Sequence, residues 1–545
     1  MWAYVRAALL VGVVGALLLS GGDASADPGL TRRVSVDSAA SQGNGSSEYA
    51  AISADGSCVA FHSGATNLVL GDTNGRDDIF VYHRQTAVTQ RVSLSSADAQ
   101  GNSDSLHPAL SNDGRYVAFD SNASNLVSSD TNVRVDVFVR DRQTNTTERV
   151  SLSSGGVEGN DTSWYPAISG DGRFVAFQSF ASNLVSGDSN NVEDIFVRDR
   201  QTATTTRVSL ATDGTQGNGG SWDVAISATG RYVAFASDAS TLVAGDTNGF
   251  GDVFVRDRDT DGDGIFDEAG SVSTTRVSVS GAGAQSNGES YYAAISAEGR
   301  YVAFSSGASN LVTGDTNVSC DTDGDTQYDD NCPDVFVRDR QAPTATVRVS
   351  LDSGGGEANA DSYDPAISAD GRYVAFWSFA NDLVSGDTNA FCDTDGDDQY
   401  DDNCPDIFMR DRDAEEDGTF DEAGEVSTVR VSVSSFGVEA NGESLDAAIS
   451  GDGSQLAFNS LASNLVPGDT NGASDVFLHD RLASAVGGIA ELPEAARDSG
   501  SSAIDRTVLA GVAAVALALA LAIGALYGVR RIGRAKASAG NTHRW

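Results

Sequence analysis

One unit is repeated seven times along this chain, and the repeat limits the possible folds more than any other feature. Each unit contains an Ala-Phe pair, and the seven phenylalanines are Phe61, Phe119, Phe177, Phe235, Phe304, Phe376 and Phe458. The first four lie 58 residues apart, and Asp-rich insertions account for the longer spacings that follow. Repetition at such a period predicts a repeat architecture in which each unit buries its apolar face against its neighbours.

Each unit contains four short segments rich in Val, Ile, Phe and Tyr, separated by turns rich in Gly, Asp, Asn and Ser. In the second unit these segments cover residues 109–111, 116–119, 136–140 and 149–152. None has a helical period, and Asp113-Gly114 between the first two is typical of a hairpin turn with positive φ. Four antiparallel strands in each of seven units predict an all-β, seven-bladed β-propeller.

The two ends of the repeat region predict how the ring of blades closes. A fourth-strand sequence, Arg33-Val34-Ser35-Val36, precedes the first unit, whereas the seventh unit ends at Arg481 without a fourth strand of its own. The N-terminal strand is therefore expected to complete the seventh blade, which leaves the ring without an open edge.

The repeated sequence also resembles a known family. Ala-Ile-Ser-x-Asp-Gly-Arg-Tyr-Val-Ala-Phe, as at residues 366–376, is similar to the blade repeat of the TolB-type, WD-repeat-like propellers of the bacterial envelope. The resemblance covers about residues 30 to 482 and implies the propeller fold. It implies no single function, because such propellers serve as scaffolds, binding proteins and enzyme domains.

Segments typical of export and membrane anchoring flank the repeat region. Residues 1–26 combine an early Arg6, an apolar run and a small-residue cleavage site, and we interpret them as a secretory signal peptide. Residues 507–529 are uncharged and long enough for one transmembrane helix, and the basic residues of 530–545 predict a cytoplasmic tail. The propeller at 27–482, joined by a stalk at 483–506, is then expected outside the cytoplasm. A sorting signal removed after export is the alternative for the C-terminal segment.

The chain is strongly acidic, with 77 Asp and Glu residues against 35 Lys and Arg residues and a formal net charge of -42. Nucleic acid and anionic lipid are poor partners for such a surface, whereas cations are good ones. The acidic residues lie in short Asp/Asn clusters, and bound divalent ions would relieve their mutual repulsion. Calcium is therefore the expected cofactor.

The first candidate calcium sites are the turns between the second and third strands, which have oxygen-bearing side chains at positions 1, 3 and 7. The alternative is that Asp and Asn close these turns through bonds to their own backbone, without an ion. The residues are Asp72, Asn74 and Asp78; Asp130, Asn132 and Asp136; Asp188, Asn190 and Asp194; Asp246, Asn248 and Asp252; and Asp469, Asn471 and Asp475.

In the fifth and sixth units this turn is expanded into a Cys-flanked, Asp-rich loop. The spacing predicts disulfides between Cys320 and Cys332 and between Cys392 and Cys404, whereas Cys58 is interpreted as a small buried apolar residue. Both loops end in Asp-Asn-Cys-Pro and resemble thrombospondin type 3 calcium repeats. An acidic loop without a fixed ion is the alternative. The resemblance implies calcium ligands at Asp321, Asp323, Asp325 and Asp329, and at Asp393, Asp395, Asp397 and Asp401.

The third candidate is the loop after the third strand of the fourth unit. It has oxygens at positions 1, 3, 5 and 9, supplied by Asp259, Asp261, Asp263 and Asp267. Gly270 stands where an EF-hand has its bidentate Glu, so the loop is not an EF-hand. The corresponding loop of the sixth unit, residues 413–422, is a degraded version and less suited to an ion.

The blades differ most from one another just before the first strand of each unit. Connections at this place surround the mouth of a propeller channel, so these residues are expected to form an aromatic and acidic ring that could hold a sugar chain or a peptide. The alternative is that they pack between blades as core. The candidates are Tyr49, His107, Trp164, Tyr165, Trp222, Asp223, Tyr291, Tyr292, Tyr363, Asp364 and Asp446.

No sequence motif of a hydrolase elbow, a metalloprotease helix or a phosphate loop is found, and no catalytic residue is assigned. The expected function is a membrane-anchored, calcium-stabilised binding or adhesion module of the cell surface, with an extracellular protein or glycan as its partner. The alternative is a carbohydrate-active or peptide-cleaving enzyme that uses Asp223, Asp364 or Asp446.

Overall fold

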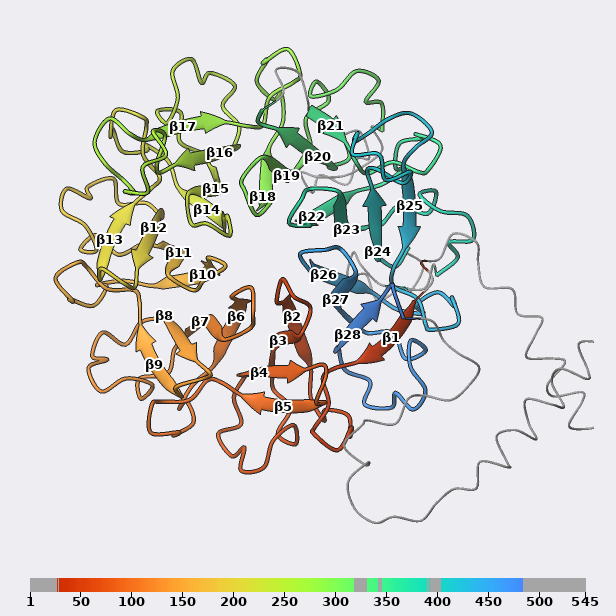
Figure 1. The fold of residues 1–545 in the computed structure, drawn as a ribbon, viewed down its shortest axis with the longest axis horizontal. Coiled ribbons are helices and arrows are strands. Elements are labelled where there is room, and N and C mark those ends of the chain that lie inside the picture. Colours follow the sequence, from red (N-terminus) through yellow and green to blue (C-terminus); the bar gives the residue numbers. More distant parts are fainter. Residues whose placement is uncertain are drawn as a thin grey trace, which may run out of the picture. The chain divides into compact units, whose positions relative to one another are not determined.

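The computed structural model describes residues 27, 29–317, 331–341, 346–389, 392 and 403–483. These residues contain 28 strands in seven four-stranded antiparallel sheets, and no helix. Figure 1 shows the sheets arranged as blades around one axis, which confirms the predicted seven-bladed propeller. The described residues contain no helix that is long and apolar enough to cross a bilayer. The predicted signal peptide, transmembrane segment and cytoplasmic tail, and all of the stalk except Ala483, lie outside the described residues.

Every blade repeats the same four strands, from the innermost to the outermost. The innermost strands are β2 (Ser47–Ile52), β6 (Ser105–Leu110), β10 (Ser163–Ile168), β14 (Ser221–Ile226), β18 (Ser290–Ile295), β22 (Ser362–Ile367) and β26 (Ser444–Ile449). The second strands are β3 (Cys58–Ser63), β7 (Tyr116–Ser121), β11 (Phe174–Ser179), β15 (Tyr232–Ser237), β19 (Tyr301–Ser306), β23 (Tyr373–Ser378) and β27 (Gln455–Ser460). The third strands are β4 (Asp78–His83), β8 (Asp136–Asp141), β12 (Asp194–Asp199), β16 (Asp252–Asp257), β20 (Asp334–Asp339), β24 (Asp406–Asp411) and β28 (Asp475–Asp480). The outermost strands are β5 (Val88–Arg91), β9 (Thr146–Arg149), β13 (Thr204–Arg207), β17 (Ser273–Arg276), β21 (Thr346–Arg348), β25 (Ser427–Arg430) and β1 (Leu30–Arg33).

The N-terminal strand closes the ring. β1 pairs antiparallel with β28, from Leu30 opposite Asp480 to Arg33 opposite Phe477, and so supplies the outermost strand of the seventh blade. This confirms the predicted closure and joins the two ends of the repeat region in one sheet.

The outermost strands end earlier than the sequence suggests. The prediction placed the fourth strand of the second unit at residues 149–152, whereas β9 ends at Arg149. The physical reason is Ser151, whose Oγ donates to the Asp136 carboxylate at 2.5 Å and accepts the backbone N–H of Val137 at 3.1 Å. The serine side chain therefore replaces the backbone ladder at this point.

The apolar core lies between adjacent blades. Between blades 2 and 3, for example, Val137 and Val139 of β8 pack with Val175 and Phe177 of β11. Every Phe of the repeated Ala-Phe pair is fully buried and stacks on a Phe of the third strand, as in blade 2, where the ring centroids of Phe119 and Phe138 are 5.9 Å apart. Because each cluster is shared by two blades, no blade buries its apolar face alone.

Two smaller predictions are also confirmed. Gly172, in the first hairpin of blade 3, has a φ of 73°, and a Cβ there would approach the Tyr116 ring of blade 2 to 2.2 Å. Glycine is thus required both by the turn and by the close approach of the neighbouring blade. Cys58 is a buried free thiol at the position that Tyr116 occupies in blade 2.

Candidate functional site

A β-bulge occurs at the same place in all seven innermost strands. In β2, Glu48 pairs with His62 and Ala51 pairs with Ala60, so Tyr49 and Ala50 together face a single residue of β3. The other six innermost strands have the same shift in register. We call the first bulged residues of the seven blades the axial ring: Tyr49, His107, Tyr165, Asp223, Tyr292, Asp364 and Asp446.

All residues of the axial ring have a left-handed backbone, with φ between 45° and 54°, although none is glycine. This conformation costs a non-glycine residue on the order of 1 kcal/mol or more. A bulge with this geometry redirects a side chain that would otherwise alternate with its neighbours. Each innermost strand also contacts the next one around the axis, so seven redirected side chains gather from all seven blades.

One side of the axial ring is aromatic. His107 stacks on Tyr165 with 3.9 Å between ring centroids, and Tyr49 meets His107 edge-on at 4.8 Å. The phenol groups of Tyr49 and Tyr165 are close enough to influence each other's pKa. Tyr49, Tyr165 and Tyr292 are 39%, 40% and 40% exposed, so their rings are accessible to a ligand.

The other four blades supply the three acidic residues of the axial ring, with Tyr292 between Asp223 and Asp364. Burial and repulsion from Asp446 and Asp223 raise the pKa of Asp364 to about 8. Burial also raises the pKa values of Asp223 and Asp446 to about 6 each, and Glu48 contributes to the shift at Asp446. Near neutral pH the ring can therefore both hold and release protons.

Asp120 was not predicted from the sequence, and it supports the aromatic side of the ring. It is 3% exposed, and its Oδ1 lies 2.8 Å from His107 Nδ1 and accepts the backbone N–H of Tyr165 at 3.1 Å. The position directly after the repeated Phe varies among the blades as the axial ring does, which is a signal that could have found it. The equivalent residues are His62, Asp120, Gln178, Ala236, Ser305, Trp377 and Asn459.

Four predicted aromatic residues lie one position before the axial ring and have different surroundings. Trp164 Nε1 donates to Glu193 at 2.5 Å, and the Trp164 ring meets Phe180 edge-on. Tyr363 packs on Trp377 with 4.7 Å between ring centroids. Trp222 lies beside Gly251, and Tyr291 stacks towards Tyr363 of the next blade. These contacts favour the packing alternative for Trp164, Trp222, Tyr291 and Tyr363.

The predicted calcium turns between second and third strands contain an arginine. In blade 2 the Arg149 guanidinium lies 3.4 Å from Asp130 and 3.0 Å from Asp136, while Asn132 Nδ2 donates to Asp136 at 2.9 Å. The other four predicted turns have the same pairs, made by Arg91, Arg207, Arg276 and Arg33. These ion pairs favour the ion-free alternative, and calcium at these turns stays a prediction.

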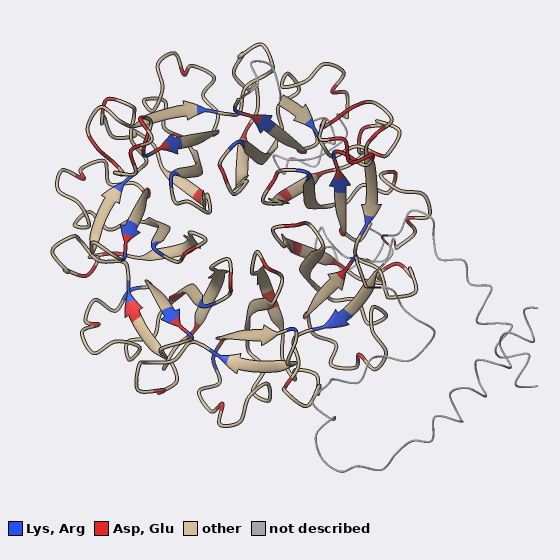
Figure 2. Cartoon of the chain, in the orientation of Figure 1, with Lys and Arg blue, Asp and Glu red and all other residues tan. Residues whose placement is uncertain are grey.

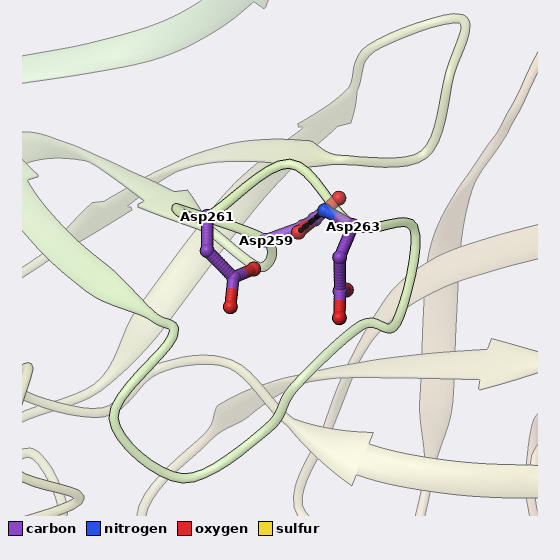
Figure 3. Close-up of side chains that lie close together, drawn as sticks. All are labelled: Asp259, Asp261 and Asp263. Carbon is purple, nitrogen blue, oxygen red and sulfur yellow. Dashed lines mark hydrogen bonds between the residues drawn. The ribbon is translucent and has the colours of Figure 1, made fainter.

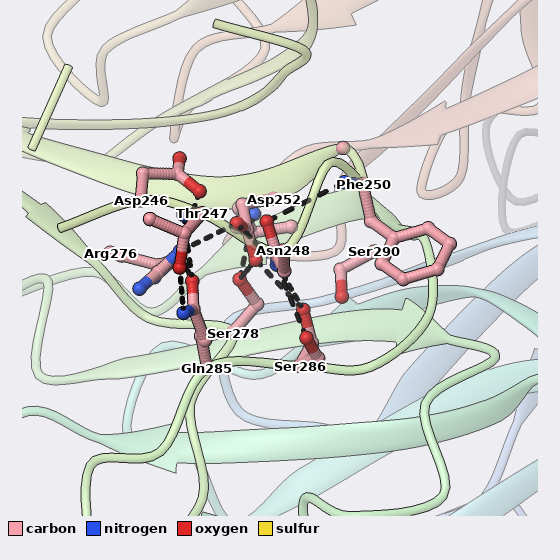
Figure 4. A network of polar contacts seen from close by, with 12 residues as sticks. Asp246, Thr247, Asn248, Phe250, Asp252, Arg276, Ser278, Gln285, Ser286 and Ser290 are labelled. Carbon is pink, nitrogen blue, oxygen red and sulfur yellow. Dashed lines mark hydrogen bonds and ion pairs between the residues drawn. The ribbon is translucent and has the colours of Figure 1, made fainter. Parts of the chain in front are cut away.

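Figure 4 shows this arrangement in blade 4. Arg276 bonds Asp246 and Asp252, and Asp252 also accepts bonds from Ser278 and Ser286. Every oxygen of Asp252 thus has a donor, so the turn is electrostatically satisfied by the chain itself.

Of the Cys-flanked loops, the structure describes the ends. Cys392 and Cys404 form the predicted disulfide. Cys332 is also disulfide-bonded, and its predicted partner Cys320 lies outside the described residues. The predicted ligands Asp321, Asp323, Asp325, Asp329, Asp393, Asp395, Asp397 and Asp401 lie outside them as well.

The loop after β16 brings three of its four predicted ligands together. Asp259, Asp261 and Asp263 each place one oxygen within 4.8 Å of the others, as Figure 3 shows. Asp267 instead pairs with Arg258 at 2.6 Å, and both Asp259 oxygens accept backbone N–H groups of the loop. The loop therefore offers part of the six to eight oxygens that calcium takes.

Comparisons with known proteins find similar folds. Neither a protein-family model nor a curated protein sequence matches the chain. TolB from Acinetobacter baumannii is 15% identical over 71% of this chain and 66% of that chain, with a TM-score of 0.33. Oligogalacturonate lyase from Vibrio parahaemolyticus is 11% identical over 83% and 93%, with a TM-score of 0.43. The propeller domain of the Trilobed protease from Pyrococcus furiosus is 8% identical over 80% and 95%, with a TM-score of 0.43. TolB and propellers of enzymes are thus both among the similar structures.

Proposed function

We propose that this propeller is a binding or adhesion module that holds its ligand at the axial ring. The observation that carries the proposal is the left-handed bulge present in all seven blades. Non-glycine residues with a strained backbone of this kind cluster at active sites and ligand-binding sites. The bulges place three half-exposed tyrosines and three carboxylates around one axis, from elements far apart in the sequence.

The chemistry of the axial ring suits an extracellular glycan or peptide. Tyrosine rings offer a flat apolar face with a polar edge, and the carboxylates accept hydrogen bonds from hydroxyl or amide groups. The flanking segments of the sequence support export, a single transmembrane anchor and a cytoplasmic C-terminus, so the proposal places the ring outside the cell.

A change of one ring aromatic tests this function. Tyr165→Leu keeps the strained backbone position occupied by a side chain but removes the ring that stacks on His107. For the full chain in detergent, we expect a glycan or peptide found on an array to bind the variant about tenfold more weakly, a loss of about 1.4 kcal/mol. Phe436→Leu, which changes an aromatic residue that is 62% exposed on an outer loop, is the control. Equal binding by all three proteins would contradict the proposal.

We also propose that calcium stabilises the propeller through its Asp-rich loops. The proximity of Asp259, Asp261 and Asp263 and the disulfide that closes the loop at Cys392 support this. Carboxylates gathered in a short loop repel one another unless a cation is present.

Metal analysis of the full chain tests the calcium proposal. We expect bound calcium, and a thermal midpoint that falls on chelation and recovers when calcium is returned. Asp393→Asn combined with Asp395→Asn is expected to lower the number of bound ions, whereas Asp213→Asn, on an exposed loop, is expected to leave it unchanged. A chain that binds no calcium would refute this part of the function.

A second candidate function is an acid–base enzyme at the same ring. The observation in its favour is that His107 is bonded to the buried Asp120, while Asp364, with a pKa raised to about 8, remains protonated at neutral pH. A histidine held by a carboxylate and a protonated carboxyl group suit acid–base cleavage of a bond in a sugar or peptide chain. Product formation that is lost in Asp364→Asn would favour the enzyme, and binding without turnover favours the binding module.

A further inference from the structure

In the described part of the chain, no arginine or lysine forms an ion pair with a carboxylate of the axial ring, and the basic group that acts on Asp446 is His107 of the ring itself. Elsewhere in each blade an arginine neutralises the carboxylate at the start of the third strand, as Arg91 does for Asp78 at 3.1 Å. Figure 2 shows the result, with basic and acidic segments next to each other in the outer parts of the blades. No ion pair of the described residues includes Asp223, Asp364 or Asp446. The axial ring thus holds three carboxyl groups that no arginine or lysine of the described residues neutralises.

Two buried polar atoms beside the ring also lack a hydrogen-bond partner. They are His62 Nδ1 and Asn459 Oδ1, on side chains that are 8% and 6% exposed. His62 stacks on Tyr49 with 5.3 Å between ring centroids, and Asn459 bonds Asp446. An unpaired buried polar atom costs about 1–3 kcal/mol, and a ligand can remove that cost by supplying the missing partner.

The equivalent residues of other blades show what these atoms lack. Asp120, Gln178 and Ser305 each accept the backbone N–H of the axial-ring residue in the next blade. Asn459 Oδ1 accepts no such bond and is therefore an unpaired acceptor beside the ring. Burial lowers the pKa of His62 to about 4, so its ring is neutral at pH 7 and adds no positive charge to the site.

The spacing of the carboxylates favours an organic cation over a metal ion. Among the described residues, the groups whose ligand atoms all lie within 4.8 Å do not include Asp223, Asp364 and Asp446, so one ion cannot bind all three directly. A guanidinium or ammonium group is larger, has several N–H donors, and interacts favourably with tyrosine faces by about 0.5–2 kcal/mol. The ring offers acceptors and tyrosine faces together.

We propose that the axial ring recognises a cationic group of its ligand, such as the guanidinium of an arginine side chain, with the carboxylates on its charge and the tyrosines on its apolar part. This inference rests on the proposed function, because it names the ligand class of the same ring. It predicts selectivity for charge, which a site for neutral sugars would not have.

A pair of peptides that differ only in charge tests the inference. Acetyl-Gly-Arg-Gly-amide and its citrulline counterpart have nearly the same shape, and the second is neutral. By calorimetry on the full chain in detergent, we expect the arginine peptide to bind at least tenfold more tightly. We also expect its binding at pH 7 to release protons, seen as a dependence of the binding enthalpy on the buffer, because the cation favours ionised Asp364.

Two variants make the result specific. The double variant Asp364→Asn and Asp446→Asn is expected to lose the preference for arginine and the proton release, whereas Asp213→Asn keeps both. Equal affinity for the two peptides, with weaker binding in Tyr165→Leu, would overturn the charge recognition and leave the ring as the binding site. A ligand whose binding no ring variant affects would instead refute the proposed function itself. Binding of neither peptide, while ring variants still weaken a glycan, would also overturn the inference.

Discussion

Arg149→Met is expected to lower the free energy of unfolding by about 3–5 kcal/mol, the cost of removing one partner from a buried ion pair. Its side chain is 4% exposed and lies near Asp130, Asp136 and Glu158, the last two at 3.0 Å and 2.9 Å. Methionine fills much of the same volume but leaves the Asp136 carboxylate, which is 0% exposed, without its counter-charge. Urea unfolding followed by circular dichroism measures the loss.

Arg134→Met is the matched control, because it removes an arginine of the same blade from the surface. Arg134 is 51% exposed and lies 3.5 Å from Asp161, so its loss is expected to change stability by less than about 1 kcal/mol. Similar destabilisation by both variants would show that the ion pairs of the turn stabilise the fold no more than a surface ion pair does. Calcium that restores stability to Arg149→Met alone would show that the turn accepts a cation once the guanidinium is gone.

The number and closure of the blades could be predicted because they depend on repetition. Seven buried phenylalanines at the same place in each unit set the number of blades, and the unpaired strand sequence near Arg33 set the closure. The ends of the outermost strands could not be predicted in the same way. Val150, Ser151 and Leu152 continue the alternating pattern of the strand in sequence. The side chain of Ser151 bonds to the start of β8 instead, and the strand ends at Arg149.

The candidate site was predicted in composition and not in geometry. The variable aromatic and acidic residues were predicted in the connection before the first strand, whereas they lie inside the innermost strands, as Tyr49 does in β2. The sequence contained no sign of the left-handed bulge, since no ring position is glycine. Without the bulge, alternation alone does not decide whether Trp164 or Tyr165 faces the axis. The role of Arg149 at its turn was missed because the arginine follows Asp136 by 13 residues and lies on another strand.

Asp364→Asn is expected to make the chain more stable at pH 8 than the natural sequence, by at least about 1.4 kcal/mol, the value of one pKa unit. The pKa of Asp364 is raised to about 8 by burial and by Asp446 and Asp223, whereas an unfolded Asp titrates near 4. The folded state therefore holds a proton that the unfolded state has lost. Stability falls as the pH rises from about 4 to about 8 and then levels. Asparagine removes that slope and also tolerates the left-handed backbone.

Thermal midpoints of both proteins between pH 4 and pH 8.5 measure this difference, which is expected to vanish near pH 4. Asp213→Asn should follow the natural sequence throughout, because its carboxyl is exposed and bonded locally to Thr215, which lowers its pKa. Parallel curves for Asp364→Asn and the natural chain would mean that the surroundings of Asp364 do not raise the pKa of its carboxyl group. A saturating arginine peptide should flatten the slope of the natural chain at high pH, because a cation offsets the charge that the fold leaves unpaired at the axis. The instability and the affinity of the ring would then have one origin, namely carboxyl groups gathered at the axis without an arginine or lysine partner.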